Sequence, residues 1–176
     1  MTIRLATLAE IDTLNALVGQ AVRELSAGYY TPAQIDSALR YVFGIDTQLI
    51  HDGTYYVAEI GGQLAGCGGW SCRRTLYGGD QSKITADPLL DPAQEAGRIR
   101  AFFVQPQFAR QGVGRAILVT CEAVARKAGF KQLDLASTLP GEPLYRALGY
   151  TPDESMSIPF PDGQSLPLIR MHKLLP

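Results

Sequence analysis

The spacing of hydrophobic positions predicts a chain in which strands and helices alternate. Apolar residues recur at helical spacing from Leu8 to Leu25, directly after a Thr-x-x-Glu sequence that has the form of a capping box. A second helix is predicted to begin at Thr31-Pro32, where proline takes the first helical position, and to end at Gly44. Two helices are therefore expected early in the chain.

Strand patterns occupy the middle and the end of the chain. Residues 54–60 and 63–72 predict a hairpin, because Gly61-Gly62 supplies the positive φ angles of a tight turn. Residues 73–97 are rich in Gly, Asp and Pro and predict a long connection with at most a short helix, a kind of segment that is often functional. Further strands are expected over residues 3–6, 98–104, 133–136, 154–160 and 166–174, and a short helix over residues 142–148.

The segment that follows strand 98–104 has the pattern of a backbone anion site. A loop with two glycines leads into a helix whose apolar face ends before Gly129. Such a loop directs free amide groups and the positive end of the helix dipole at one point. Without a Cβ, Gly112 and Gly114 can bend into left-handed conformations and approach a ligand closely. We therefore predict a phosphate or diphosphate ligand, held by Arg110, Gln111, Gly112, Val113, Gly114 and Arg115.

Other phosphate-binding patterns fit less well. The chain contains no Gly-Lys-Ser or Gly-Lys-Thr, which excludes a Walker loop. The dinucleotide fingerprint requires a third glycine where this chain has Ile117, so a dinucleotide-dependent enzyme stays as a weaker alternative. A helix start that merely needs flexible residues is the other reading of this loop.

Composition narrows the class of protein. With 176 residues and 46% hydrophobic content, the chain is expected to form one domain over residues 1–176. A formal net charge of -1 gives no general attraction to nucleic acid or to an anionic membrane, so neither is an expected partner. The N-terminal residues lack the apolar core of a signal peptide and no apolar run could span a bilayer, so we expect a cytoplasmic protein. Cys67, Cys72 and Cys121 are expected to be reduced, without a disulfide or a zinc site.

Two motifs give the chain a resemblance to the GNAT superfamily of acyl-CoA-dependent N-acyltransferases. FFVQPQFARQGVGRAIL is similar to the family's acetyl-CoA loop, Gln/Arg-x-x-Gly-x-Gly/Ala, and LYRALGY is similar to its late Phe-Tyr-x-x-x-Gly-Phe element. The resemblance implies an α/β (α+β) fold, with a central mixed, mostly antiparallel sheet of about six to seven strands flanked by about four helices. It also implies acetyl-CoA as co-substrate and no metal. The chain departs from the pattern at Ala109, which takes the Gln/Arg position, and at Thr138, where many members carry a cofactor-binding Asn.

The resemblance also assigns roles within the site. Backbone groups of Phe102, Phe103 and Val104, where the strand is expected to bulge, would bind the pantetheine arm and polarise the thioester carbonyl. Thr138 would contact the cofactor arm through its hydroxyl. Tyr145 would act as general acid, since a phenol and a thiol have ordinary pKa values of about 10 and 8.5. The alternative for Tyr145 is a ring packed on a short helix with its hydroxyl in water.

The remaining candidates are open to more than one interpretation. Asp134 is our candidate for the general base, or else a solvated carboxylate, and Glu59 and His51 are weaker candidates. Arg98 and Arg100 alternate along one strand and are expected to share a face with Phe102 and Val104. They need anionic partners, either Asp91 or Glu95 or the carboxylate of a substrate. Trp70, together with the long connection, is expected to form a wall of the substrate site or to belong to the core.

These observations lead to one main hypothesis and one alternative. We expect an N-acetyltransferase that moves an acetyl group from acetyl-CoA directly to the primary amine of a small molecule or peptide. A covalent intermediate is not expected, because Cys121 has no histidine nearby in the sequence. The alternative is a catalytically silent sensor or subunit that binds CoA. The acceptor stays open, and so does a homodimer formed through residues 166–174.

Overall fold

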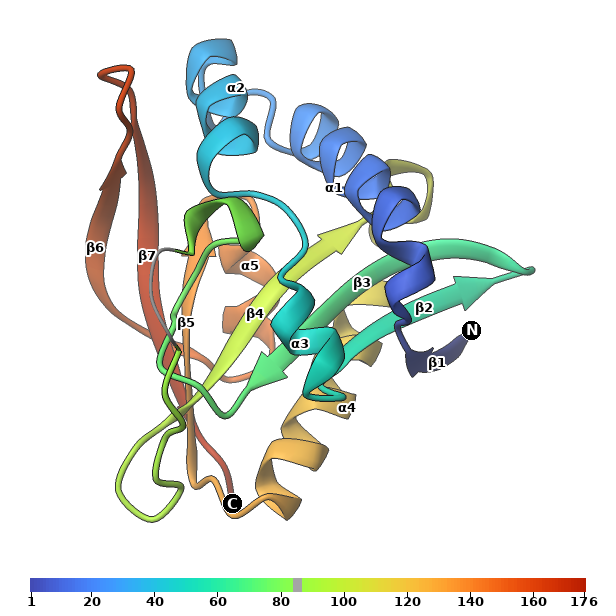
Figure 1. Ribbon diagram of the computed structural model, residues 1–176, viewed down its shortest axis with the longest axis vertical. Coiled ribbons are helices and arrows are strands. Elements are labelled where there is room, and N and C mark those ends of the chain that lie inside the picture. Colours follow the sequence, from blue (N-terminus) through green and yellow to red (C-terminus); the bar gives the residue numbers. More distant parts are fainter. Residues whose placement is uncertain (84–86) are drawn as a thin grey trace.

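The computed structural model describes residues 1–83 and 87–176 (Figure 1). Within these ranges the chain forms seven strands and five α-helices, which are joined by short 3-10 turns. The strands are β1 (Thr2–Leu5), β2 (Tyr55–Ile60), β3 (Gln63–Ser71), β4 (Gly97–Val104), β5 (Gln132–Thr138), β6 (Thr151–Pro159) and β7 (Ser165–Leu174). The helices are α1 (Ile11–Leu25), α2 (Pro32–Tyr41), α3 (Thr47–His51), α4 (Val113–Lys127) and α5 (Glu142–Ala147).

The strands form one mixed sheet in the order β1-β2-β3-β4-β5-β7-β6. All neighbouring strands are antiparallel except β4 and β5, which are parallel. The expected sheet is therefore confirmed at seven strands. Strand β7 is paired on both sides within the chain, so β6 provides the free edge at this end of the sheet.

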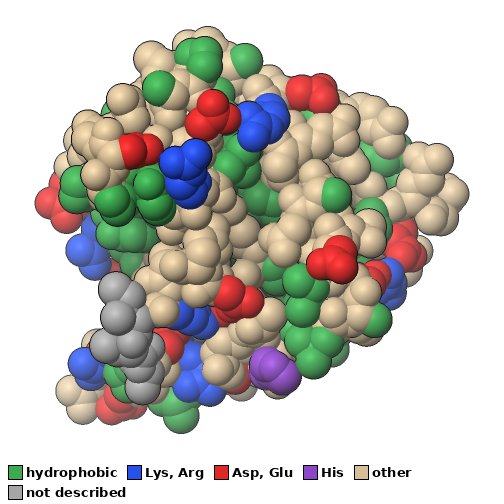
Figure 2. All heavy atoms as spheres, turned by 45° about the horizontal axis from the view of Figure 1, so that its top comes forward, with side chains coloured by type: hydrophobic (Ala, Val, Ile, Leu, Met, Phe, Trp, Pro, Cys, Tyr) green, Lys and Arg blue, Asp and Glu red, His purple; other side chains and the backbone are tan. Residues whose placement is uncertain are grey.

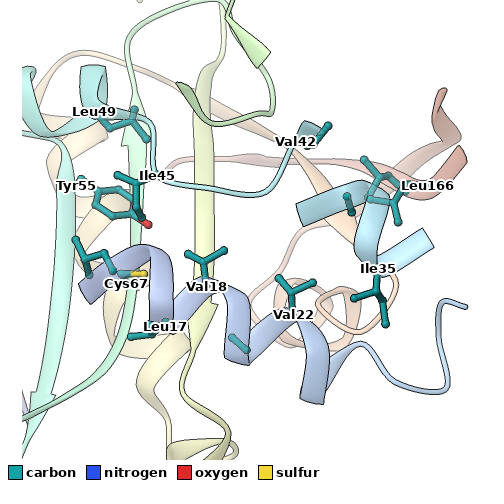
Figure 3. Packing of buried hydrophobic residues seen from close by; sticks show 14 of the residues in the cluster. Leu17, Val18, Val22, Ile35, Val42, Ile45, Leu49, Tyr55, Cys67 and Leu166 are labelled. Atoms are coloured by element: carbon teal, nitrogen blue, oxygen red, sulfur yellow. The ribbon is translucent and has the colours of Figure 1, made fainter. Parts of the chain in front are cut away.

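Helices cover both faces of the sheet. Helices α1, α2 and α3 lie over one face, and α4 lies over the other (Figure 1). Figure 3 shows the first core, in which Val18 and Val22 of α1 point into the layer that also holds Leu49 and Tyr55. The second core packs the apolar face of α4, including Ile117 and the other buried residues of that helix, against β2–β5. Two separate cores on one sheet explain why both early helices and α4 are amphipathic.

Local signals in the sequence account for most of the elements. The Gly61-Gly62 turn has φ angles of 59° and 78°, which confirms the predicted hairpin. Both helix starts with a capping residue are confirmed, since Thr7 donates its amide to Glu10 at 2.9 Å and Thr31 accepts from Gln34 at 3.2 Å. Helix α2 ends three residues earlier than predicted, and the five-residue α3 was not predicted at all.

The face assigned to the residues at the end of β4 was wrong. The register of β4 against β3 shifts at a bulge that includes Ala101, a non-glycine residue with φ of 53°. The bulge adds one residue to β4, so every residue beyond it moves to the opposite face of the sheet. As a result Phe102 and Val104 pack in the α4 core, and Phe103 packs in the other core.

Strand β3 contains glycines at positions where a side chain would not fit. A Cβ on Gly69 would lie 2.5 Å from the carbonyl oxygen of Thr54. A Cβ on Gly68 would lie 2.7 Å from the ring of Phe102, next to the bulge. Gly68 thus lets the ring of Phe102 pack directly on the backbone of β3, and Gly69 lets Thr54 and Tyr55 approach it closely.

We expect Gly69→Ala to lower the free energy of unfolding by about 1–3 kcal/mol, because the new methyl group collides with backbone that cannot rotate away. Gly19→Ala in α1 is the matched control, since a Cβ there has no neighbour within 4 Å. That substitution should stabilise the helix by about 0.5–1 kcal/mol. Urea denaturation of both variants checks the prediction, and equal effects at the two positions would contradict it.

No helix in residues 1–83 and 87–176 combines the length and the apolar composition needed to cross a membrane.

Candidate active site

The two parallel strands at the centre of the sheet separate soon after they meet. Strands β4 and β5 pair only where Gly97 and Arg98 lie beside Leu133 and Asp134. Beyond these residues, the edge of β4 that faces β5 has no strand partner, and the two strands diverge (Figure 1). The divergence leaves an opening in the middle of the sheet, next to the bulge.

A cleft lies at this opening and is lined from both sides of the sheet. Phe102 and Leu135, which belong to the α4 core, form one side together with Tyr145 of α5. The other side is formed by residues 42–44, between α2 and α3, and by residues 76–78 of the long connection. On the face seen in Figure 2, hydrophobic side chains line a hollow near the centre, with charged side chains of both signs around it.

Helix α4 begins beside this cleft with unpaired backbone amides. Gly112 precedes the helix with φ of 83°, in the left-handed region, as the sequence predicted. Among the described residues, the amides of Gly112, Val113, Gly114 and Arg115 donate to no partner. Arg110, which has φ of 64°, and Arg115 are both exposed. The start of α4 therefore offers four amide donors without an acceptor in the described chain, of which those of Gly112 and Arg115 belong to exposed residues, together with two exposed guanidinium groups.

The left-handed conformation predicted for the second glycine of the loop was wrong. Gly114 is helical, and the structure uses its missing Cβ for packing, since a Cβ there would lie 2.9 Å from Leu144 Cδ2. The small residue thus lets α5 approach the first turn of α4. This contact brings LYRALGY next to the loop that carries the free amides.

The bulge of β4 is fixed by a side chain from β2, two strands away in the sheet. The hydroxyl of Tyr55 donates to the carbonyl oxygen of Ala101 at 2.8 Å, and this tyrosine is completely buried. Burial raises the pKa of Tyr55 well above its ordinary value, so the hydroxyl stays a donor. The backbone of Phe102 and Phe103 therefore leaves the bulge in a defined direction, along the cleft.

Tyr145 presents its hydroxyl at this cleft from inside the α4 core. The side chain is 8% exposed, and its ring makes edge contacts with Phe102 and Tyr150 at centroid distances of 6.3 and 5.7 Å. Burial raises the pKa of Tyr145 well above its ordinary value, and its hydroxyl has no hydrogen-bond partner in the described chain. Thr138 lines the same cleft. The site thus contains a neutral phenol that is available to a ligand.

The candidates for the general base lie elsewhere. Asp134 accepts from Arg98 and Arg170, at 3.2 Å in each case, and it lines a polar surface hollow beside His172 instead of the cleft. Glu59 is paired with Arg4 at 2.7 Å, and His51 is exposed at the end of α3. Neither lines the cleft, so among the described residues it contains no carboxylate or imidazole.

The two arginines of β4 have acidic partners that the sequence did not indicate. Arg98 pairs with Asp134, and Arg100 pairs with Asp46 at 2.9 Å, in place of the expected Asp91 or Glu95. Arg100 is 2% exposed and also donates to the carbonyl oxygens of Thr75 and Gly78. Through these contacts the buried side chain of Arg100 connects β4 to two loops, one that contains Asp46 and one that contains Thr75 and Gly78.

Trp70 lies in the core behind the cleft. Its side chain is 4% exposed and contacts the ring of Phe130 edge-on at 5.8 Å. Cys67 and Cys121 are also buried, and burial raises the pKa of Cys67 to about 12, which keeps this thiol protonated. Within residues 1–83 and 87–176, no group of three or more His, Cys, Asp or Glu side chains is arranged to hold a metal ion.

Solved structures that resemble this chain are N-acetyltransferases or complexes with CoA. A GCN5-related N-acetyltransferase from Rhodopseudomonas palustris matches with a TM-score of 0.73 at 16% identity, over 99% of this chain and 95% of that one. PaiA N-acetyltransferase from Thermoplasma acidophilum, in complex with coenzyme A, has a TM-score of 0.66 at 14% identity over 98% of both chains. YncA from Salmonella typhimurium, with its cofactor acetyl-CoA, has a TM-score of 0.65 at 20% identity, over 100% of this chain and 94% of that one.

These matches, at 14–20% identity over nearly the whole chain, show that it shares the fold of these solved structures. The sequence itself matches the family model of the acetyltransferase (GNAT) family over residues 19–150, most of its length. The chain therefore belongs to the GNAT acetyltransferase family, as its two motifs indicated. A search of curated proteins by sequence gave no match.

Proposed function

We propose that this protein transfers an acetyl group from acetyl-CoA directly to a primary amine. The observation that carries the proposal is the position of Tyr145, a neutral phenol on the cleft between β4 and β5, beside the free amides that begin α4. Two of the similar structures contain coenzyme A or acetyl-CoA. The residues present fit this cofactor, because amide donors and arginines suit a diphosphate and an unpaired strand edge suits an amide-rich arm.

The chain supplies binding and positioning groups for each part of the reaction. Amides 112–115, with Arg110 and Arg115, bind the diphosphate, and the free edge of β4 near Phe102 and Val104 binds the arm and polarises the thioester carbonyl. The amine nitrogen attacks the thioester carbon, the carbon–sulfur bond breaks, the nitrogen loses one proton to water, and the departing sulfur takes one up. Tyr145 donates a hydrogen bond to that sulfur, and Thr138 lines the same passage.

The raised pKa of Tyr145 determines how its hydroxyl takes part in the reaction. A phenol with a pKa above 10 stays protonated at every pH where the protein works, so it is always able to donate. It is also a weaker acid than a free thiol, so a hydrogen bond to the developing thiolate contributes more than a completed proton transfer. The buried cysteines have no histidine partner in the described hydrogen bonds, which supports direct attack without an acyl-enzyme.

We expect coenzyme A to shift the amide signals of Gly112, Val113, Gly114 and Arg115 strongly in a two-dimensional ¹⁵N–¹H spectrum, because these amides gain hydrogen bonds to an anion. Gly163, at the tip of the β6–β7 hairpin, serves as the control and should not move. Unchanged loop amides at saturating coenzyme A would contradict the proposed cofactor site.

A catalytically silent CoA-binding protein is the second candidate. The cleft favours it in one respect, since no carboxylate or imidazole among the described residues lines the cleft to deprotonate an amine. Release of free thiol from acetyl-CoA in the presence of amines distinguishes the two functions. Binding without thiol release for any amine would support the silent protein.

A further inference from the structure

The acceptor side of the cleft is formed by two loops that are joined to each other. The amide of Gly79 donates to the carbonyl oxygen of Val42 at 2.8 Å, and the amide of Asp80 donates to that of Ile45 at 3.1 Å. The side chain of Gln81 adds a bond to the carbonyl oxygen of Phe43 at 3.1 Å. Residues 42–44 and 76–78 therefore form one wall that is organised before any substrate binds.

Arg100 stabilises this wall from the side that does not line the cleft. It donates to the carbonyl oxygens of Thr75 and Gly78 at 2.9 and 2.7 Å, on either side of the wall residues 76–77, and pairs with buried Asp46. Lys83 also donates to Asp46. These charges neutralise one another inside the protein and do not line the cleft.

The side chains on the acceptor side of the cleft are mostly apolar, and the polar part of the lining comes from backbone groups and uncharged hydroxyls. Phe43 contacts Phe103 edge-on at 5.9 Å, and Leu76, Ala101 and Ala136 complete this side. The ionisable side chains that line the cleft, in the part of the chain that the structure describes, are the two phenols of Tyr77 and Tyr145. Among the described residues, no side chain in this lining carries a charge that would neutralise a carboxylate, a phosphate or a second ammonium group on the acceptor.

We infer that the acceptor is an apolar monoamine, which is bound with its nitrogen in the neutral form. The inference rests on the proposed function and narrows it to one substrate class. Burying an unpaired charge is costly, so an acceptor with a second charged group is rejected by this wall. An alkyl ammonium ion would have to lose its proton to water before it enters, because the cleft offers it no base.

Matched amines test the substrate class. Hexylamine is compared with 1,6-diaminohexane, and phenethylamine with phenylalanine, so that each pair differs by one charged group. We expect kcat/KM, measured by thiol release, to be at least about tenfold higher for the member of each pair that lacks the additional charged group. Equal or higher values for the members with the additional charge would overturn the inference and leave the proposed acetyl transfer intact. Thiol release with other amines but with none of these four would also overturn the inference alone, whereas no thiol release with any amine, while CoA still binds, would overturn both.

The pH dependence tests the neutral form. Without a protein base, kcat/KM for hexylamine should rise about tenfold per pH unit up to the pKa of the amine, about 10, as the neutral fraction grows. A plateau near neutral pH would reveal a base in the protein and overturn this part of the inference. Tyr145 does not explain such a plateau, since burial keeps this phenol protonated throughout the range.

A carboxylate introduced into the wall should shift the substrate preference toward the diamine, which tests the inferred substrate class. Leu76→Asp places an acidic group on the wall and should raise the ratio of kcat/KM for 1,6-diaminohexane over hexylamine by about tenfold. Leu89→Asp is the matched control, because Leu89 is 63% exposed and does not line the cleft. The same change in both variants would show that the charge acts from a distance, which would count against residues 76–78 as the acceptor wall. CoA affinity, measured by calorimetry, should be unchanged in both.

Discussion

Replacement of Asp46 by asparagine is expected to lower the free energy of unfolding by about 3–5 kcal/mol. Asp46 is 1% exposed and accepts from Arg100 at 2.9 Å, from Lys83, and from the amide of Gln48 at 3.0 Å, where it caps α3. The amide side chain keeps the shape but not the charge. A guanidinium group that is 2% exposed would then remain inside the protein without an anion, which is far more costly than losing an exposed ion pair.

An exposed pair provides the control for Asp46→Asn. Arg23 and Asp36 lie 2.7 Å apart, but their side chains are 59% and 62% exposed, so Asp36→Asn should change the stability by less than about 1 kcal/mol. Urea denaturation measures both variants. Similar losses in the two would show that burial does not decide the strength of these pairs. The acceptor wall should also loosen in Asp46→Asn, which would raise the KM for the amine while leaving CoA affinity unchanged.

Replacement of Tyr145 by phenylalanine should lower the rate of the chemical step by about 100-fold, because the leaving sulfur loses its hydrogen-bond donor. The affinity for coenzyme A should stay nearly the same, since the amides of α4 are untouched. The stability should also be retained, because the hydroxyl makes no hydrogen bond within the described chain. Single-turnover measurements with acetyl-CoA isolate the chemical step from product release.

Tyr150 is the matched control for Tyr145. Its ring contacts that of Tyr145 at 5.7 Å, and its hydroxyl is buried without a hydrogen-bond partner among the described residues. Tyr150→Phe should therefore leave the rate unchanged and leave the protein equally stable or slightly more stable. A small effect of Tyr145→Phe in single turnover, similar to that of Tyr150→Phe, would remove the phenol from the mechanism.

Elements with local signals could be predicted from the sequence, and elements set by distant contacts could not. Gly61-Gly62, the capping residues Thr7 and Thr31, and the amphipathic face of α4 each act within a few residues, and each was predicted. Helix α3 is only five residues long, too short to show a period, and Asp46 at its start was the one available signal.

The bulge of β4 shows why the faces of a strand can be misassigned. Alternation places residues correctly only while the register is kept, and no local feature of Ala101 indicates a positive φ. The bulge is held by Tyr55 from β2 and by the space above Gly68 of β3, both distant in sequence. The partners of Arg98 and Arg100 were missed for the same reason, because Asp134 and Asp46 reach them only through the tertiary fold.

The free amides of the loop before α4 could be predicted, but the proposed acceptor wall could not. The free amides of the loop follow from a helix start, a property of consecutive residues. The wall combines residues 42–44 and 76–78, which have no shared pattern and meet only through backbone bonds between loops. The long connection was expected to contribute to the substrate site, and residues 76–78 from it line the cleft.

The opening between β4 and β5 has a consequence for the order of events. Because its lining comes from both layers of the molecule, the proposed function would let the donor and the acceptor reach the same point from opposite sides of the sheet. Neither blocks the entrance of the other, so initial-rate plots should intersect and either product should be able to leave first. An inhibitor in which coenzyme A is covalently joined to an amine would have to pass through the opening between β4 and β5. Such an inhibitor is therefore best formed within the site, by reaction of coenzyme A with a haloacetylated amine.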